Sequence, residues 1–301
     1  MLVRQARPAE ARPPVSGTTR LDHTELVADA FYELQDESPI GTPEGFARVR
    51  STEHTVGPWD QRLQHAGPPS ALLTRAVRRL PGLPDRALPT RLSFDILAPV
   101  PVADLVVRSR VLRPGRRIAL AEATLAPADD PERPVMFLRA WLMRRRDGGA
   151  DGHALEVPGS PAPPGSDAPL MPRPRGWVPG YLDAVEWRWV EGRFEEPGPA
   201  TVWTRVLVDL VSGEPMSPVE RVAAVADSAS GISAVASPLE VLFVNTDLTL
   251  HLTGEPRGEQ LWMSAVTSVG RDGVGRTRSE IGDVTGAFAQ GSQSLFVEPR
   301  T

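Results

Sequence analysis

The stretch that decides the fold reads SPVERVAAVADSASG and spans residues 217–231. Its first residues form a capping box, with Ser217 as the cap, Glu220 three positions later and proline at the first helical position. Asp227 falls at the edge of an apolar stripe, where a side chain lies between core and cleft. The stripe has helical spacing and predicts a helix that Gly231 can close; it consists of Val219, Val222, Ala223 and Ala226.

Segments of alternating apolar residues surround this helix. On its C-terminal side, strands are predicted at residues 239–253, 260–269, 274–281 and 287–297. An earlier helix begins after the turn at 64–69, and its stripe ends at Leu80 before Pro81-Gly82. Around that helix, further strands are predicted at residues 46–56, 91–97, 104–112, 118–125 and 135–145, and two more, at 184–194 and 200–210, precede the helix at 217–231. The short turns between successive strands favour antiparallel sheets.

The two halves of the chain repeat one pattern of strand, helix and four strands. Two pairs of turn residues lie 155 positions apart: Gly115 and Gly270, and Pro101 and Pro256. The segment 92–96 also resembles 248–252 in its apolar pattern. These matches predict two copies of one helix-on-sheet unit. The Pro- and Gly-rich segment 147–180 is predicted as the linker, between units at 21–146 and 181–301, and residues 1–20 as a disordered tail.

Composition excludes several classes of protein. The net charge of −5 argues against nucleic acid or an anionic membrane as a partner. All 33 basic residues are Arg, so lysine Schiff bases and P-loop lysines are excluded. The absence of Cys excludes thiolate nucleophiles and disulfides, and the five His lack the spacing of a zinc site. Neither a signal peptide nor a membrane span is evident, so we expect a cytoplasmic protein without a metal ion or other cofactor.

Five segments together resemble the double-hotdog acyl-CoA thioesterases of type II and their relatives. They are His65 to Pro69, Phe94 to Pro101 with Gly115, Ala226 to Ser228, Asn245 to Leu252, and Gly291 to Leu295. The resemblance implies an α+β fold of two tandem hotdog units, each a long helix wrapped by a curved antiparallel sheet. It also implies hydrolysis of an acyl-CoA, or another acyl thioester, in the seam between the units, and it leaves further homo-oligomers possible.

The resemblance carries the family's catalytic residues onto Asp227, Asn245 and Gln293. Asn245 replaces the more usual Thr, and an amide can still donate and accept hydrogen bonds. Asp227 would act as general base, and the two amides would orient the water. The start of the first helix, at Gly67 with His65 nearby, would bind the substrate and stabilise the oxyanion. Pro68 and Pro69 supply no N–H there.

Alternatives remain open at this point. Asp227 can be a structural helix-edge carboxylate, Gln293 can face solvent, Asn245 can cap a turn, and Gly67 can be a simple turn glycine. A histidine in a loop before a helix, such as His65, is more often an ordinary loop residue than a catalytic base. Two other functions of the same cleft stay open: a dehydratase or cyclase acting on a thioester or polyketide-like intermediate, and a non-catalytic acyl-ligand binder, which the Asn at position 245 leaves possible. Hotdog dehydratases use a His with an acidic residue.

Overall fold

The computed structural model describes residues 29–146, 160–237 and 240–300. The predicted tail at residues 1–20 lies outside the described residues, as does the part of the predicted linker at 147–159. The proposed domain boundaries therefore stay predictions.

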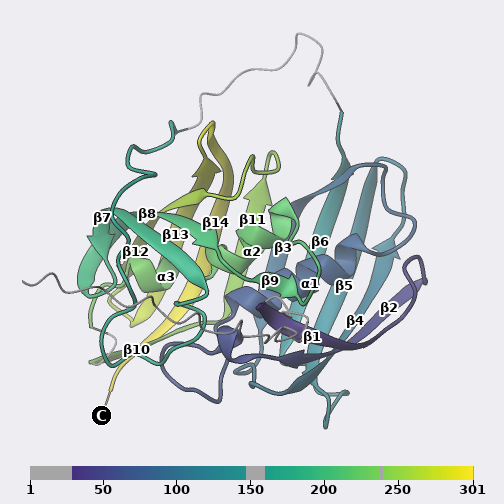
Figure 1. Cartoon of the computed structure of the whole chain (residues 1–301), viewed down its shortest axis with the longest axis horizontal. Coiled ribbons are helices and arrows are strands. Elements are labelled where there is room, and N and C mark those ends of the chain that lie inside the picture. Colours follow the sequence, from purple (N-terminus) through teal and green to yellow (C-terminus); the bar gives the residue numbers. More distant parts are fainter. Residues whose placement is uncertain (1–28, 147–159, 238–239, 301) are drawn as a thin grey trace, which may run out of the picture.

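The first unit places one helix against a six-stranded sheet (Figure 1). Its helix α1 spans Gly67–Arg78, after a short 3-10 turn at Glu53–Thr55. The spatial order of its strands is β3-β6-β5-β4-β2-β1. In chain order these strands are β1 Ala30–Glu37, β2 Glu44–Ser51, β3 Ala87–Ile96, β4 Asp104–Arg113, β5 Ile118–Pro127 and β6 Met136–Arg144.

The second unit repeats this arrangement. The helix α2 spans Pro218–Ala226. The strands lie in the order β11-β14-β13-β12-β8-β7, which matches the first unit strand for strand. The strands are β7 Val185–Arg193, β8 Glu196–Val206, β9 Asp209–Val211, β10 Val241–Asn245, β11 Asp247–Leu252, β12 Leu261–Val269, β13 Val274–Asp283 and β14 Gly286–Pro299. Gly115 and Gly270 occupy equivalent turns, and the predicted repeat is confirmed.

Four predicted elements differ from the structure. The strand at 46–56 ends at Ser51, and Glu53–Thr55 form a 3-10 helix. The strand at 200–210 is divided into β8 and β9, and β9 pairs in parallel with β1 of the other unit. The strand at 239–253 is broken at Thr246 into β10 and β11. The helix ends at Ala226 instead of Gly231, which lies inside a separate four-residue helix, α3 at Ala229–Ile232. The second unit therefore has a short helix where a long one was predicted.

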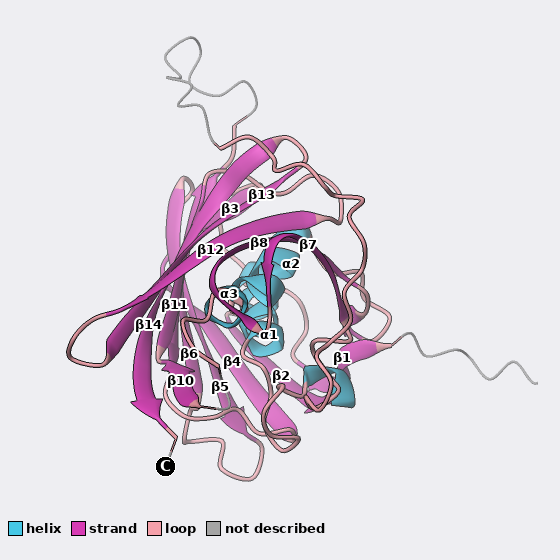
Figure 2. Cartoon of the chain, turned by 90° about the vertical axis from the view of Figure 1, so that its left-hand side faces the viewer, coloured by secondary structure: helices cyan, strands magenta, loops and turns pink. Residues whose placement is uncertain are grey.

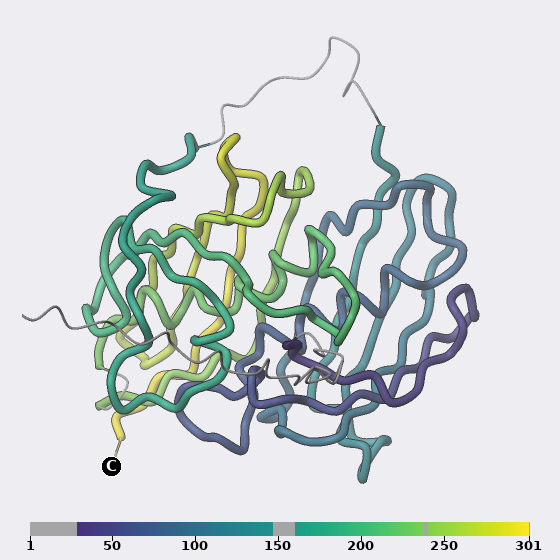
Figure 3. Tube along the Cα trace, viewed as in Figure 1, coloured from purple at the N-terminus to yellow at the C-terminus, as the bar shows by residue number. Residues whose placement is uncertain are grey.

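Strands β3 and β11 join the two units into one 14-stranded sheet. Figure 3 shows the two halves of the chain side by side on this sheet. Ser93 pairs with Thr249, and their hydroxyl oxygens lie 3.2 Å apart. These residues hold equivalent positions in the repeated pattern, so an approximate two-fold axis passes between them.

The helices pack against each other inside the curve of the sheet (Figure 2). Every residue of α2 except Pro218 and Arg221 is buried, because the helix contacts both α1 and the sheet. This largely antiparallel α+β arrangement agrees with the predicted tandem hotdog fold; within residues 29–146, 160–237 and 240–300, only β1 and β9 pair in parallel.

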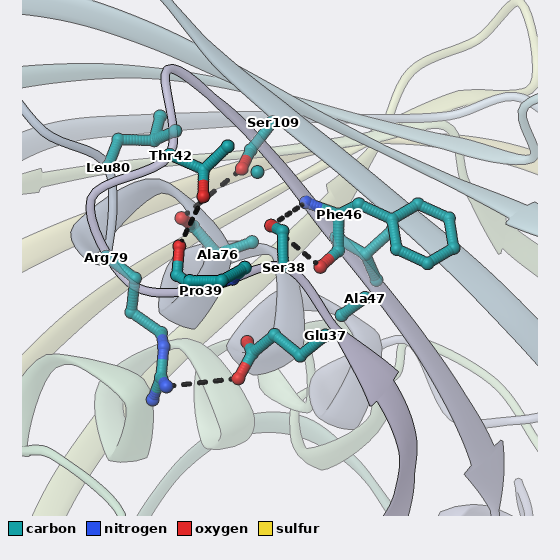
Figure 4. A pocket seen from close by; sticks show the side chains of 12 residues that line it. Glu37, Ser38, Pro39, Thr42, Phe46, Ala47, Ala76, Arg79, Leu80 and Ser109 are labelled. Carbon is teal, nitrogen blue, oxygen red and sulfur yellow. Dashed lines mark hydrogen bonds and ion pairs between the residues drawn. The ribbon is translucent and has the colours of Figure 1, made fainter.

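Ion pairs also connect the units at the C-terminal end of α1. Arg75 is 5% exposed, and its guanidinium contacts Glu37 at 2.7 Å and Glu214 at 2.9 Å. Arg79 contacts the same two carboxylates at 3.0 and 3.3 Å. Figure 4 shows Arg79 and Glu37 pointing toward each other across a pocket between α1, β1 and β2. Because Glu214 lies just beyond β9, this ion cluster links the entry to α2 with the first unit.

Candidate functional site

Asp227 lies where the second helix stops. It follows Ala226 as the C-terminal cap residue, with helical dihedral angles of φ −64° and ψ −22°, and it is 6% exposed. Its Oδ1 accepts a hydrogen bond from Asn245 Nδ2 at 2.6 Å and a second from Gln293 Nε2 at 3.3 Å. The structure therefore brings together the three residues that the sequence suggested as a catalytic set.

Gln293 is held in one orientation by bonds to both ends of its amide. It lies on β14 and is 2% exposed, so the interpretation as a solvent-facing residue is wrong. Its Oε1 accepts from the Ser230 backbone N–H at 3.1 Å, and its Nε2 donates to the Asp227 main-chain oxygen at 3.1 Å. Because the amide oxygen must face the N–H donor, the amide nitrogen must face Asp227.

Asn245 reaches Asp227 from the break between β10 and β11. It is the last residue of β10, where it pairs with Leu295 of β14. Its side-chain amide donates to the carboxylate across the site at 2.6 Å, which is short for an N–H···O hydrogen bond. The turn-capping interpretation is therefore wrong, and the amide gives the carboxylate a strong donor at this position.

His65 comes from the first unit and completes the site across the seam. Its Nδ1 lies 3.4 Å from Asp227 Oδ2, and its ring stacks on Tyr181 with centroids 3.8 Å apart and an interplanar angle of 8°. Burial lowers the pKa of His65 below its ordinary value of 6.5, and the nearby Asp227 opposes this shift. Nδ1 also accepts the Gly67 N–H at 3.0 Å. That bond requires a lone pair on Nδ1, so we assign a neutral imidazole with its proton on Nε2.

The Nε2 atom of His65 is not fully buried. It has no hydrogen-bond partner within the described part of the chain. It is also absent from the buried polar side-chain atoms that lack a partner there, which belong to Arg91, Trp203, Arg205 and Arg221. The Nε2–H is therefore available to a substrate, and the interpretation of His65 as an ordinary loop histidine does not hold.

Gly67 contributes less to anion binding than the sequence suggested. Its N–H is taken up by His65, Pro68 and Pro69 have none, and the Ser70 N–H donates to the Ala66 carbonyl at 3.1 Å. The first turn of α1 therefore offers a substrate no open backbone donor from Gly67 to Ser70. The oxyanion role predicted for Gly67 conflicts with this bonding, and His65 Nε2–H is a nearby side-chain donor that could take that role.

The need for glycine at position 67 comes from the other helix. A Cβ atom there would lie 2.1 Å from the carbonyl oxygen of Ala224 in α2, far inside van der Waals contact. The interpretation as a simple turn glycine is incomplete, because the residue permits a close approach of α1 and α2.

We expect Gly67→Ala to force the helices apart and to lower the free energy of unfolding by about 1–3 kcal/mol, as overpacking does in well-packed interiors. Urea denaturation measures this loss. Gly82→Ala is not a neutral control because Gly82 has a positive φ, so Gly231→Ala, with open space around its Cβ position, is the matched comparison. Equal stability of the two variants would contradict the close-approach argument.

The depressed pKa of His65 predicts a pH dependence of stability. In the unfolded chain His65 binds a proton near pH 6.5, whereas in the folded protein burial lowers its pKa, so protonation needs a lower pH. Below that pH the unfolded state carries more protons, so stability falls with falling pH until the folded pKa is passed. Urea denaturation between pH 7.5 and 5 is expected to show this loss, and His65→Asn should weaken it. An unchanged slope in the variant would refute the assignment.

Two features of the site carried no local signal in the sequence. Tyr181 donates its hydroxyl to the Ala224 carbonyl at 2.9 Å, and the Ser228 hydroxyl lies 2.9 Å from the same phenol oxygen. Ser230 contributes only its backbone. No group of three or more potential metal ligands occurs in the parts of the chain that the structure describes, and no helix there is long and apolar enough to cross a membrane.

Comparison with known protein families agrees with this geometry. The acyl-CoA thioesterase N-terminal domain matches residues 55–143, and the acyl-CoA thioesterase C-terminal domain matches residues 165–297. The chain belongs to the acyl-CoA thioesterase family. In this thioesterase-family chain the N-terminal match contains α1 and the C-terminal match contains α2 and α3. The site lies where the two matched segments meet.

Solved structures show the same fold. A hotdog-fold protein of unknown function from Alicyclobacillus acidocaldarius is 17% identical, with a TM-score of 0.66 over 88% of this chain and 97% of its own. A protein provisionally called thioesterase II from Thermobifida fusca is 16% identical, with a TM-score of 0.67 over 87% and 95%. Acyl-CoA thioesterase II from Mycobacterium marinum is 14% identical, with a TM-score of 0.57 over 88% and 96%. No curated protein matches the sequence.

Proposed function

We propose that this member of the family hydrolyses acyl thioesters, with Asp227 as the general base. One observation carries the proposal: Oδ1 of Asp227 is held by two amide donors, while Oδ2 receives no hydrogen bond from the described residues and lies beside His65. A buried carboxylate held in this way is oriented and has one oxygen left to accept a proton from water.

The reaction needs two proton transfers, one from water to Asp227 and one from Asp227 to the leaving group. Asp227 Oδ2 accepts a proton as the water oxygen bonds to the thioester carbonyl carbon. The charge that develops on the carbonyl oxygen accepts a hydrogen bond from His65 Nε2–H, in place of the backbone donor first expected at Gly67. The C–S bond then breaks, and the proton on Asp227 passes to the departing thiolate, which restores the carboxylate. Asn245 and Gln293 keep the carboxylate in position throughout.

Membership in the family supports acyl-CoA as the substrate class. The test is thiol release from short, medium and long acyl-CoAs, followed with a thiol-reactive dye. The chain has no Cys, so the enzyme contributes no background signal. Turnover on at least one chain length is expected, and failure on all of them would contradict hydrolysis of acyl-CoA.

A second candidate function is dehydration of a hydroxyacyl thioester. The contact between His65 Nδ1 and Asp227 Oδ2 at 3.4 Å favours it, because a His and an acid would be needed to remove the α-proton and to protonate the departing hydroxyl. A 3-hydroxyacyl-CoA distinguishes the two reactions in one vessel. Thiol release without ultraviolet absorbance of an enoyl product supports hydrolysis, whereas enoyl product without thiol supports dehydration.

The site is proposed to occur once per chain. In the strand pairing, Ala140 on β6 stands where Gln293 stands on β14, because Ser93 pairs with Arg139 as Thr249 pairs with Ser292. Arg79 follows α1 as Asp227 follows α2. A carboxylate with amide donors therefore has no counterpart at the equivalent end of the seam within the described residues. Calorimetric titration with a non-hydrolysable thioether analogue of acyl-CoA should give one molecule bound per chain, and two equal sites would contradict the proposal.

A further inference from the structure

Tyr181 is a buried residue that contacts both units beside the site. Its backbone N–H donates to the Val56 carbonyl at 2.9 Å, in the segment that leads to His65. Gly180 allows this approach, since a Cβ there would lie 2.5 Å from the same carbonyl oxygen. The Tyr181 backbone is thus attached to the first unit, although its own chain continues directly into β7 of the second.

The two ends of the Tyr181 side chain act on opposite halves of the site. Its ring covers one face of the His65 imidazole at van der Waals distance. Its hydroxyl donates to the carbonyl of Ala224, and the Ser228 hydroxyl can donate to the phenol oxygen. The Ser228 N–H bonds to Val225 instead of Ala224, so α2 has already left its regular pattern there. The tyrosine satisfies a carbonyl that the end of the helix leaves unpaired.

The surroundings of Tyr181 keep the side chain rigid and protonated. Its residue surface is 0% exposed, and Trp187 packs edge-on against its ring with centroids 6.2 Å apart. Burial raises the pKa of the phenol well above its ordinary value. The hydroxyl therefore remains a donor over the working range of pH.

We propose that Tyr181 is a positioning residue that holds His65 and the end of α2 in one arrangement. In that arrangement His65 Nε2–H and Asp227 Oδ2 can contact the same bound substrate molecule. This inference rests on the proposed function for its catalytic consequence. The stack fixes the plane of the imidazole, the Gly67 N–H fixes its rotation, and the phenol hydroxyl fixes the residues on either side of Asp227. Removing the ring frees the imidazole, whereas removing only the hydroxyl frees the end of α2.

The experiment compares Tyr181→Phe and Tyr181→Leu with Tyr32→Phe. The chain has two tyrosines, and Tyr32 is likewise buried with its hydroxyl bonded, here to Gln64 at 2.7 Å. Thermal unfolding shows which variants are folded. Turnover of acyl-CoA gives kcat and KM, and NMR titration of the His65 ring, assigned with His65→Asn, gives its pKa without any substrate.

Tyr181→Leu is expected to lower kcat by up to about 10²-fold, as misplacement of a reacting group by an ångström can do, with a smaller change in KM. The His65 pKa should rise toward 6.5 as burial is relieved. Tyr181→Phe should leave the His65 pKa unchanged and should lower kcat less than Tyr181→Leu does. Tyr32→Phe should lose stability without moving the His65 pKa.

A folded Tyr181→Leu protein with the His65 titration and kcat of Tyr32→Phe would overturn the proposal. The NMR result also separates this inference from the proposed function. If the wild type released no thiol from any acyl-CoA while Tyr181→Leu still shifted the His65 pKa, the proposed hydrolysis would fail and the positioning of His65 would stand.

Discussion

Asp227→Asn is expected to reduce kcat for acyl-CoA hydrolysis by about 10²- to 10⁴-fold, the contribution of a positioned general base. The substitution keeps the size of the side chain but removes its capacity to take a proton from water. It also places an amide among the donors of Asn245 and Gln293, which then compete for its single oxygen. Thiol release under saturating substrate measures the loss.

Asp247→Asn is the matched control. Asp247 lies two residues beyond Asn245, and its carboxylate accepts the Ser294 N–H at 2.8 Å outside the site. Its replacement should leave kcat within a factor of about two, since the amide oxygen can still accept the Ser294 N–H and the residue touches no reacting atom. If a folded Asp227→Asn protein retained the kcat of this control, Asp227 would not be the base.

Arg75→Ala is expected to lower the free energy of unfolding by about 3 kcal/mol. The value is the lower end of the range for breaking a buried ion pair, because Glu214 is 36% exposed and water can partly solvate it. Glu37 is 17% exposed and would keep only the partly exposed Arg79 as a partner. Because these carboxylates come from β1 and from the segment before α2, the variant weakens the attachment of the units to each other.

Urea denaturation of Arg75→Ala against Arg108→Ala tests this expectation. Arg108 pairs with Glu132 at 3.1 Å on the surface, where the two side chains are 46% and 85% exposed. Such exposed pairs contribute about 0–1 kcal/mol. Equal losses in the two variants would show that burial of the Arg75 cluster has no energetic consequence.

Local patterns predicted most of the fold. The capping box placed the start of α2 at the right residue, and its reciprocal bonds between Ser217 and Glu220 are present. The end of the helix was wrong because long-range bonds decide it. Tyr181 takes the Ala224 carbonyl and Gln293 takes the Ser230 N–H, and both partners are distant in the sequence.

The candidate site was likewise predicted only in part from the sequence. Asp227, Asn245 and Gln293 were found from a family resemblance that spans the chain. The role of Gly67 was misjudged because its N–H is used by the side chain of His65, two residues earlier, in a conformation that no pattern encodes. Tyr181 was missed because a stacking partner 116 positions away from His65 leaves no periodicity to detect.

The shared sheet has a consequence for synthesis on the ribosome. The edge of β3 is covered only when β11 pairs with it, and 151 residues separate Ile96 from Asp247. At about 5–20 residues per second, the nascent first unit waits about 8–30 s with that edge uncovered. During this time it exposes unpaired backbone groups that other strands can bind. Because β11 is part of the same chain, it pairs with β3 as soon as it has been synthesised. This limits the time during which a strand of a neighbouring nascent chain can bind the edge of β3.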